Sequence, residues 1–516
     1  MSVRPPVIEA VEVRPILPLW VALLVAAGSG PVLDAGFPDK DIWPLTFVGI
    51  GLVLVPLVGR SVPASAIVGF VAGASFYFTH IFWASLFLGP LPMSALAVLA
   101  SLFFAAGAVA IALAYRWLPR AFPTVPGRLV LLPVVVAGLW TAREAWASVW
   151  PYGGFAWGRV ALSQSESPLA QLFSWLGISG VSFAMVLVVA ATIEAIRFPG
   201  APRLVRAVLP TTLALVLLAA PAFPLALDGA LRVAAVQGNA KAGYFDRREP
   251  GDLLQAQLDA TVPLFGQEGI DVVLWPEGAT DRSPLTDAYT AEVFDLISEE
   301  FDAPLVGWGI TERGGRIYNT EILWEAGKGA TDLYDKRHPV PFGEYVPDRA
   351  FWEPFAPDLI GLIQREYTPG TTDMVFDIDG VLAGINICFD IVDDQLLNES
   401  VREGAQVIFA SSNTADFGLT DEAEQQLAIA RIRALELGRS VVNISTVGVS
   451  AIVAPDGSTV QQLPRFEAGS MVADVALSDT VTPAVLLGRQ VEWFVSGLGL
   501  AAVLTAAAFV AGNRRV

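Results

Sequence analysis

The segment Gly269-Ile-Asp-Val-Val-Leu-Trp-Pro-Glu277 predicts a buried β-strand that ends at a turn carrying a carboxylate. A short apolar run of this kind is typical of strands covered on both faces. Five further segments share the pattern: 231–237, 304–309, 382–388, 407–410 and 440–445. Amphipathic segments such as 422–437 separate several of them, so we predict an α/β layered fold. Reactive groups in such folds gather where strands end, which favours Glu277 and Cys388 as functional residues.

The sequence on either side of this α/β block is apolar enough to lie in a membrane. Hydrophobic residues make up 54% of the chain and charged residues only 16%. Seven apolar stretches precede the block, at 16–33, 42–58, 66–88, 91–115, 129–149, 168–196 and 207–227, and one follows it at 493–511. Most reach the ~20 residues that a helix needs to cross the hydrocarbon core. We therefore predict a multi-span α-helical membrane domain joined to the α/β domain.

The charges divide the chain in the same way. Residues 230–490 hold 41 acidic and 18 basic residues, whereas the rest of the chain holds 10 and 14. An acidic soluble block offers no basic face for nucleic acid. The predicted domains are a membrane domain with about seven spans at 1–229, a catalytic domain at 230–490 and a closing transmembrane helix at 491–516.

Basic residues near the spans predict the orientation, because they favour the cytoplasmic side. With the N-terminus inside, eleven basic residues, among them Arg4, Arg514 and Arg515, lie in cytoplasmic segments. Only Lys40, Arg143 and Arg159 lie in outer ones. The sequence therefore predicts a multi-pass protein of the cell membrane, with both termini cytoplasmic and the α/β domain outside the cytoplasm.

Cys388 is the single cysteine of the chain and therefore cannot form an intramolecular disulfide. A catalytic thiolate needs a base or a cationic neighbour. His80 falls in a predicted span, so His338 is the one histidine available for a Cys–His pair. The alternative is a carboxylate base with a lysine, and Glu277 and Lys336 supply those groups. A carboxylate can take the thiol proton, and an ammonium can stabilise an oxyanion.

Three motifs resemble the Glu–Lys–Cys pattern of the nitrilase superfamily, in the same order. They are Trp275-Pro-Glu277, Lys336 with the following Pro341-Phe-Gly-Glu344, and Gly384-Ile-Asn-Ile-Cys388. More narrowly, the sequence resembles the apolipoprotein N-acyltransferase family over nearly the whole chain. Further motifs that carry this resemblance are Val340-Pro-Phe-Gly-Glu-Tyr-Val-Pro347, Val236-Gln-Gly-Asn239 and Ala430-Arg-Ile-Arg-Ala-Leu-Glu-Leu-Gly-Arg439.

The resemblance implies a two-step reaction without cofactor or metal. Cys388 would take an acyl chain from a phospholipid as a thioester, and the N-terminal amine of a diacylglyceryl-cysteine lipoprotein would then receive it. Glu277 would be the base in both steps. Lys336 and the backbone N–H of Phe389 would hold the oxyanion, and Glu344 would orient Lys336 or support the base.

Several positions depart from the family pattern. Asp390 stands where the family often has glutamate, and Asp416 stands where tryptophan is usual. After Gln237-Gly-Asn239 the expected tryptophan is replaced by Tyr244 or Phe245. These departures concern supporting and substrate-contacting positions rather than the three catalytic residues.

Further candidates for substrate contact are Tyr244, Phe245 and Asn413, together with Phe351 and Trp352 in an apolar stretch at 351–363. That stretch is interpreted either as a core insertion or as a mobile arm that dips into lipid. Arg431 and Arg433 on the helix at 422–437 are predicted to form structural ion pairs.

Three other functions are compatible with parts of the sequence. A membrane-tethered amidohydrolase of the nitrilase type would share the triad but use water as its second nucleophile. A transporter with an accessory domain would need paired charges inside the spans, for which the candidates are His80, Arg143, Glu144 and Glu194. An inactive binding module gives no reason for Glu277, Lys336 and Cys388 to occur together.

Overall fold

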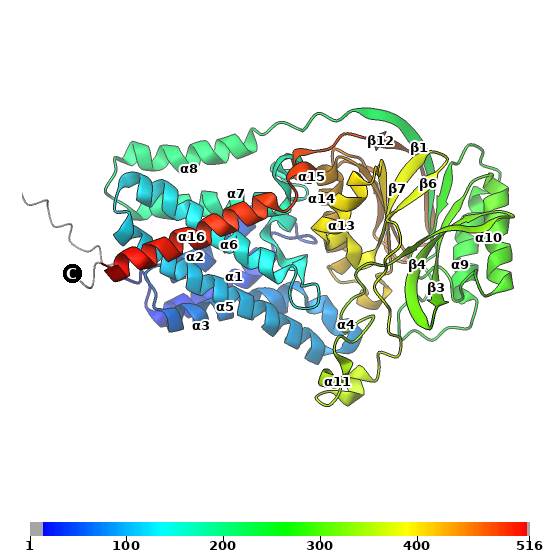
Figure 1. Cartoon of the computed structure of the whole chain (residues 1–516), viewed down its shortest axis with the longest axis horizontal. Coiled ribbons are helices and arrows are strands. Elements are labelled where there is room, and N and C mark those ends of the chain that lie inside the picture. Colours follow the sequence, from blue (N-terminus) through cyan, green and yellow to red (C-terminus); the bar gives the residue numbers. More distant parts are fainter. Residues whose placement is uncertain (1–13, 513–516) are drawn as a thin grey trace, which may run out of the picture.

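The computed structural model describes residues 14–512; the predicted cytoplasmic ends with Arg4, Arg514 and Arg515 lie outside this range. A helical bundle is followed by an α/β domain, and the chain returns to the bundle at its end (Figure 1). The long helices of the bundle are α1 (Leu19–Asp34), α2 (Pro44–Leu54), α3 (Val62–His80), α5 (Pro90–Ala121), α6 (Leu132–Ala147), α7 (Phe173–Arg197), α8 (Arg203–Leu218) and α16 (Gln490–Gly512). The predicted combination of a helical membrane domain and an α/β domain is confirmed.

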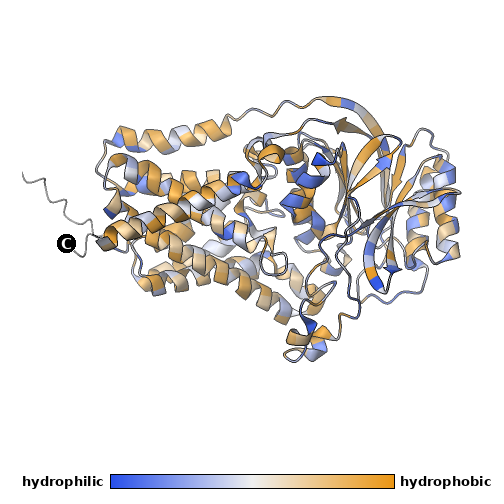
Figure 2. Cartoon of the chain, viewed as in Figure 1, coloured by the Kyte–Doolittle hydropathy of each residue, from blue (hydrophilic) through white to orange (hydrophobic). Residues whose placement is uncertain are grey.

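Five of the described helical segments are long and apolar enough to cross a membrane. They are Val62–His80, Pro90–Ala121, Gly127–Ala147, Ala170–Arg197 and Gln490–Gly512. The apolar helices Leu19–Asp34 and Pro44–Leu57 are shorter. Apolar residues dominate the bundle, and polar residues collect on the helices of the α/β domain (Figure 2). The total of about seven preceding spans stays a prediction.

The ionisable residues considered for a transporter are paired within the bundle. Glu194 accepts hydrogen bonds from Arg128, with Nη2 at 2.7 Å, and also pairs with Arg197. Arg143 lies 3.3 Å from Glu144. His80 Nδ1 lies 3.2 Å from Asp34 Oδ1. These charges therefore have local partners that reduce the cost of burying them.

The α/β domain contains two six-stranded sheets. The first has the order β12-β1-β2-β3-β4-β5, and the second has the order β11-β10-β9-β8-β7-β6. The strands of the first sheet are β1 (Leu227–Gln237), β2 (Val272–Leu274), β3 (Leu305–Arg313), β4 (Arg316–Glu325), β5 (Gly329–Asp335) and β12 (Gly469–Ser478). Those of the second are β6 (Val375–Ile378), β7 (Val381–Ile387), β8 (Val407–Ser412), β9 (Ser440–Ser445), β10 (Ser450–Val453) and β11 (Thr459–Leu463). Strands β1, β2 and β3 are parallel, as are β7, β8 and β9.

Helices cover the outer faces of the two sheets. Figure 1 shows α9 (Asp252–Thr261) and α10 (Ala288–Phe301) on the side away from the bundle, and α13 (Asp394–Arg402) and α14 (Glu422–Leu437) on the side toward it. Asp287 caps α10, because its carboxylate accepts a hydrogen bond of 3.0 Å from the Thr290 amide. Gly438, with φ 66°, ends α14 in the left-handed conformation that glycine adopts freely.

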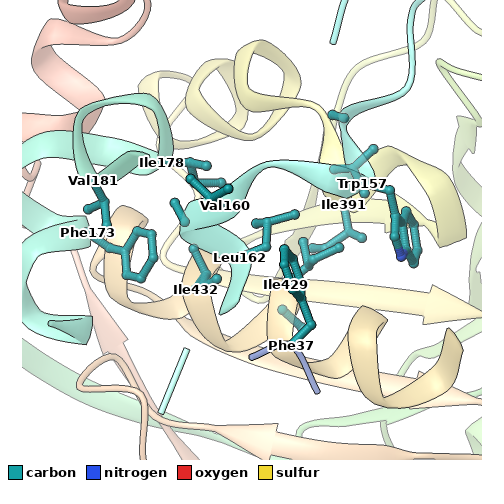
Figure 3. Close-up of a cluster of buried hydrophobic side chains, with 14 of the residues drawn as sticks. Phe37, Trp157, Val160, Leu162, Phe173, Ile178, Val181, Ile391, Ile429 and Ile432 are labelled. Carbon is teal, nitrogen blue, oxygen red and sulfur yellow. The ribbon is translucent and has the colours of Figure 1, made fainter. Parts of the chain in front are cut away.

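An apolar joint connects the bundle to the α/β domain. Figure 3 shows side chains of both parts packed together: Phe37, Trp157, Val160, Leu162, Phe173, Ile178 and Val181 from the bundle and its connecting segments, and Ile391, Ile429 and Ile432 from the α/β domain. All ten are buried. The helix α14 is therefore covered on both faces, which explains why nearly all of its residues are buried.

Candidate active site

Cys388 follows β7 and is the first residue of the 3₁₀ turn η8 (Cys388–Val392). Its φ is 49°, in the left-handed region that a residue with a side chain rarely adopts. Such a conformation costs of the order of 1–3 kcal/mol and persists only where the surrounding structure holds it. The sharp turn ends the strand at the thiol, as predicted for a reactive group at a strand end.

Glu277 follows β2 by three residues and is buried. Its Oε1 accepts a hydrogen bond of 2.7 Å from Asn319 Nδ2, and its Oε2 accepts one of 3.0 Å from the Asn413 amide. Lys336 Nζ lies 3.7 Å from the same Oε1. Each carboxylate oxygen is thus fixed by a donor, which holds Glu277 in one orientation.

Lys336 follows β5 and is 1% exposed. Its Nζ lies 2.7 Å from Glu344 Oε2, and Glu344 also accepts hydrogen bonds from Asn319 Nδ2 (2.8 Å) and the Val340 amide (2.7 Å). Asn319 therefore bridges Glu277 and Glu344. Burial alone would lower the pKa of Lys336, but Glu344 and Glu277 outweigh it, and this pKa lies well above its ordinary value.

The surroundings of the Cys388 thiol shift its pKa upward. Burial and the charge of Glu277 raise the pKa of Cys388 well above its ordinary value, although Lys336 acts in the opposite direction. Burial also raises the pKa of Glu277, and Lys336 again opposes the shift. A thiol with a raised pKa needs a base to become a nucleophile, and the charge of Glu277 has the largest effect on Cys388 among the nearby carboxylates.

His338, the other candidate base for Cys388, contacts two aspartates. Its Nδ1 lies 3.4 Å from Asp393 Oδ2, and its backbone amide donates to Asp390 Oδ1 at 2.9 Å. The fully buried Asp390 also accepts a hydrogen bond of 2.8 Å from the Tyr334 hydroxyl. Asp390 therefore binds residues on both sides of Lys336, Tyr334 and His338. It connects the turn that contains Cys388 to the segment that carries Lys336.

The predicted substrate-contacting aromatic residues form two groups, which are linked where the Tyr244 hydroxyl donates to the Leu362 carbonyl at 3.3 Å. Tyr244 and Phe245 contact each other at 4.9 Å between ring centroids, and both contact Phe87 of the bundle at 5.9 Å. Phe351 and Trp352 instead belong to α11 (Arg349–Trp352), where Trp352 Nε1 donates to the Tyr152 hydroxyl at 3.3 Å. Phe351 is exposed.

Asn413 and Phe389 each have a defined place beside these groups. Asn413 follows β8, and its backbone N–H donates a hydrogen bond to Glu277 that helps to hold the carboxylate in place. Its side chain donates to the Ala242 carbonyl at 2.8 Å. The Phe389 ring is stacked on Trp157 with centroids 6.4 Å apart. The aromatic ring of Phe389 thus faces the bundle.

Comparison with known proteins assigns both parts of the chain to known families. The model of the apolipoprotein N-acyltransferase N-terminal domain matches residues 29–191, and the carbon-nitrogen hydrolase model matches residues 232–482. An apolipoprotein N-acyltransferase of Mycolicibacterium smegmatis is 30% identical over 95% of this chain and 86% of its own length. This chain belongs to the apolipoprotein N-acyltransferase family.

Two further comparisons cover the family and the fold. The apolipoprotein N-acyltransferase of Photobacterium profundum is 26% identical over 92% of this chain and 93% of its own length. A solved amidase of the nitrilase superfamily from Nesterenkonia is 17% identical, with a TM-score of 0.38, over 52% of this chain and 97% of the amidase. The chain spans 86% and 93% of the length of these two N-acyltransferases.

Within this member of the N-acyltransferase family, the departure at Asp416 has a local structural role. Its Oδ1 accepts a hydrogen bond of 2.8 Å from the Tyr244 amide. Burial raises the pKa of Asp416 to about 6. The two departures from the family pattern, at Asp416 and Tyr244, are therefore in contact. The Asp416 carboxyl group, which stands in place of a tryptophan, holds the backbone of the segment that carries Tyr244.

Two buried arginines hold the segment that follows Cys388. Arg159, from the bundle, makes a bidentate contact with Asp394 and also donates to the Val392 carbonyl at 3.4 Å. Arg433 of α14 donates to Asp394 Oδ1 at 2.7 Å and to the Ile391 carbonyl at 2.9 Å. The predicted structural ion pair of Arg433 is confirmed, and Arg431 pairs with Glu166 at 3.0 Å.

Two polar side chains on β4, close to Glu277, were not predicted from the sequence. Asn319 orients both carboxylates of the site, and Glu321 lies two residues further along the same face of the strand. Glu321 is fully buried, and the charge of Glu277 acts on it. The available signal was that Asn319 and Glu321 occupy alternate positions in the middle of a strand and are both buried.

Replacing Glu321 with glutamine is expected to make stability less dependent on pH. Burial raises the pKa of Glu321 well above its ordinary value, so the folded protein keeps the proton that the unfolded chain releases. The wild type therefore loses unfolding free energy as the pH rises above about 4.3, by up to about 1.4 kcal/mol per pH unit until the folded pKa is reached. Thermal unfolding in one detergent at mildly acidic and neutral pH measures the difference. The exposed Glu312→Gln is the control, and parallel pH profiles for wild type and Glu321→Gln would contradict the expectation.

Proposed function

We propose that this protein transfers an acyl chain from a membrane phospholipid to the N-terminal amine of a diacylglyceryl-cysteine lipoprotein. The observation that carries the proposal is the buried pair of Glu277 and Lys336, 3.7 Å apart, whose charges both act on the Cys388 thiol. Membership of the N-acyltransferase family supports lipoprotein acylation as the reaction. Both substrates are lipids, which accounts for a soluble catalytic domain joined to a helical bundle.

In the first step Glu277 takes the proton of Cys388, and the sulfur attacks the ester carbonyl of the phospholipid. The Lys336 ammonium and the backbone N–H of Phe389 stabilise the oxyanion. As the intermediate collapses, the C–O bond breaks and Glu277 returns the proton to the oxygen of the departing lysophospholipid. A thioester on Cys388 remains.

In the second step the lipoprotein amine attacks the thioester carbonyl. Glu277 accepts a proton from the amine, the C–S bond breaks, and the sulfur of Cys388 leaves as a thiol with that proton. The product is an amide. Glu344 supports the reaction by holding Lys336 in place through its contact of 2.7 Å.

The proposal includes an orientation and three domains. Residues 1–229 form the membrane domain, 230–490 the catalytic domain outside the cytoplasm, and 491–516 the closing transmembrane helix, with both termini cytoplasmic. The bias of eleven basic residues against three supports this orientation. Tyr244, Phe245, Phe351, Trp352 and Asn413 are proposed to contact the substrates, since Phe87 and Tyr152 join these segments to the bundle.

Intact-mass measurement of the purified protein incubated with phospholipid alone tests the first step. The wild type is expected to gain one acyl chain, removable by neutral hydroxylamine, and Cys388→Ala is expected to gain none. Release of the chain onto a diacylglyceryl peptide would then identify the acceptor. Absence of both adduct and lysophospholipid in folded protein would overturn the proposal, and release of the chain only to water would favour the amidohydrolase.

A further inference from the structure

Helices α7 and α8 enclose a groove on the outside of the bundle, of about 570 Å³. Its wall on α7 includes Val188, Thr192 and Ile196, and its wall on α8 includes Leu215. Figure 1 shows α8 set apart from the other helices, along one side of the bundle. The helix has no buried residue over its 16 positions. A volume of this size falls in the range of about 300–1,000 Å³ that is usual for sites of small ligands.

One end of the groove carries two arginines of α8, Arg203 and Arg206, three residues apart and so on one face of the helix. Within residues 14–512 neither forms an ion pair. Arg206 donates from Nη1 to the Ala195 carbonyl at 3.3 Å, and its Nε is buried without a hydrogen-bond partner. The nearby Arg128 and Arg197, by contrast, share the carboxylate of Glu194.

No acidic residue lines the groove among the residues that the structure describes. The arginine end therefore has uncompensated positive charge and a buried donor, while the remainder of the groove is mostly apolar. This end is the start of α8, which lies at the end of the bundle farthest from the α/β domain (Figure 1). A ligand with an anionic head and an apolar tail matches this division.

We propose that the groove between α7 and α8 binds one anionic phospholipid of the bilayer. Its phosphate contacts Arg203 and Arg206, and one acyl chain lies along Ile196, Thr192 and Leu215. Basic pockets between transmembrane helices on the cytoplasmic side are known to hold anionic headgroups. The site is at the opposite end of the bundle from Cys388, so it is separate from the proposed acyl-donor site.

Native mass spectrometry of the full-length protein in detergent tests the proposal. The protein is titrated with phosphatidylglycerol or with phosphatidylcholine, and lipid adducts are counted. The wild type is expected to bind one phosphatidylglycerol in preference to phosphatidylcholine. The variant Arg203→Gln/Arg206→Gln is expected to bind it about 30-fold more weakly, since two arginine–headgroup interactions are lost. Inorganic phosphate added in excess should leave the lipid adduct in place, because the acyl chain supplies part of the binding.

A matched control removes two charges from another helix end, in Arg116→Gln/Arg120→Gln on α5, and should bind as the wild type does. A second variant, Leu215→Trp, fills the groove without a change of charge and should also lose the adduct. Equal binding by the wild type and both groove variants, or displacement by inorganic phosphate, would overturn the proposal. Acyl-thioester formation on Cys388 should be unchanged in both variants, which separates this test from that of the proposed function.

Discussion

Replacing Glu277 with glutamine is expected to slow acylation of Cys388 by about 10²–10⁴-fold, the range attributed to positioned general bases. Glutamine keeps the size of the side chain and can still meet Asn319 but cannot take the thiol proton. The raised pKa of Cys388 means that few thiolates form without that base. The rate at which the acyl adduct accumulates, followed by intact mass under single-turnover conditions, measures the effect.

The matched control for this change is Glu268→Gln, an exposed glutamate nine residues earlier, which should acylate at the wild-type rate. The pH profile gives a second readout. Because burial raises the pKa of Glu277, wild-type acylation should begin to fall, as the pH is lowered, at a higher pH than an ordinary carboxylate would give. Rapid acylation of Glu277→Gln with an unchanged profile would assign the base to another residue.

The three proposed catalytic residues stand out in the sequence because each lies in a local motif with its own chemical signature. Glu277 and Cys388 end apolar strands, and Lys336 with Glu344 lies in a proline-rich loop. Glu277 and Lys336 follow strands of one sheet, and Cys388 follows a strand of the other. Each strand end could be recognised in the sequence, but the packing of the two sheets that brings the ends together could not.

Asn319 could not be predicted in the same way. It lies in the middle of β4, where alternate residues face the other sheet, and its function depends on two carboxylates that are 42 and 25 residues away. Asp390 gives the converse case. The sequence placed it near Cys388 by spacing, but only the structure shows that it binds Tyr334 and the backbone of His338 rather than a substrate.

Arg159 shows which contacts between the helical bundle and the α/β domain could not be predicted from the sequence. The sequence counts it as a basic residue of an outer loop, and its partner Asp394 is 235 residues later. The structure buries Arg159 and joins it in a bidentate contact to the half-buried Asp394, two residues after Val392. The position of the nucleophile therefore depends on the bundle as well as on the α/β fold. This dependence gives a physical reason for the two parts to remain rigidly joined.

Replacing Arg159 with leucine is accordingly expected to lower the free energy of unfolding by about 3–5 kcal/mol, the usual cost of removing one partner of a buried ion pair. Asp394 would keep Arg433 as a partner but would lose two of its hydrogen bonds. Thermal unfolding in detergent measures the loss. Acylation of Cys388 should slow as well, because the Val392 carbonyl loses its donor.

The control is Arg232→Leu, which removes an arginine from an exposed pair with Asp474 and should cost no more than about 1 kcal/mol. A second change, Asp394→Leu added to Arg159→Leu, separates charge from packing. It removes the carboxylate that has lost its two hydrogen bonds from Arg159 and leaves Arg433 beside Glu436, so it should recover part of the stability that the single change loses. Recovery of stability without recovery of the acylation rate would show that Arg159 positions Cys388. An Arg159→Leu protein as stable and as active as the wild type would show that the apolar contacts of the joint suffice without the ion pair.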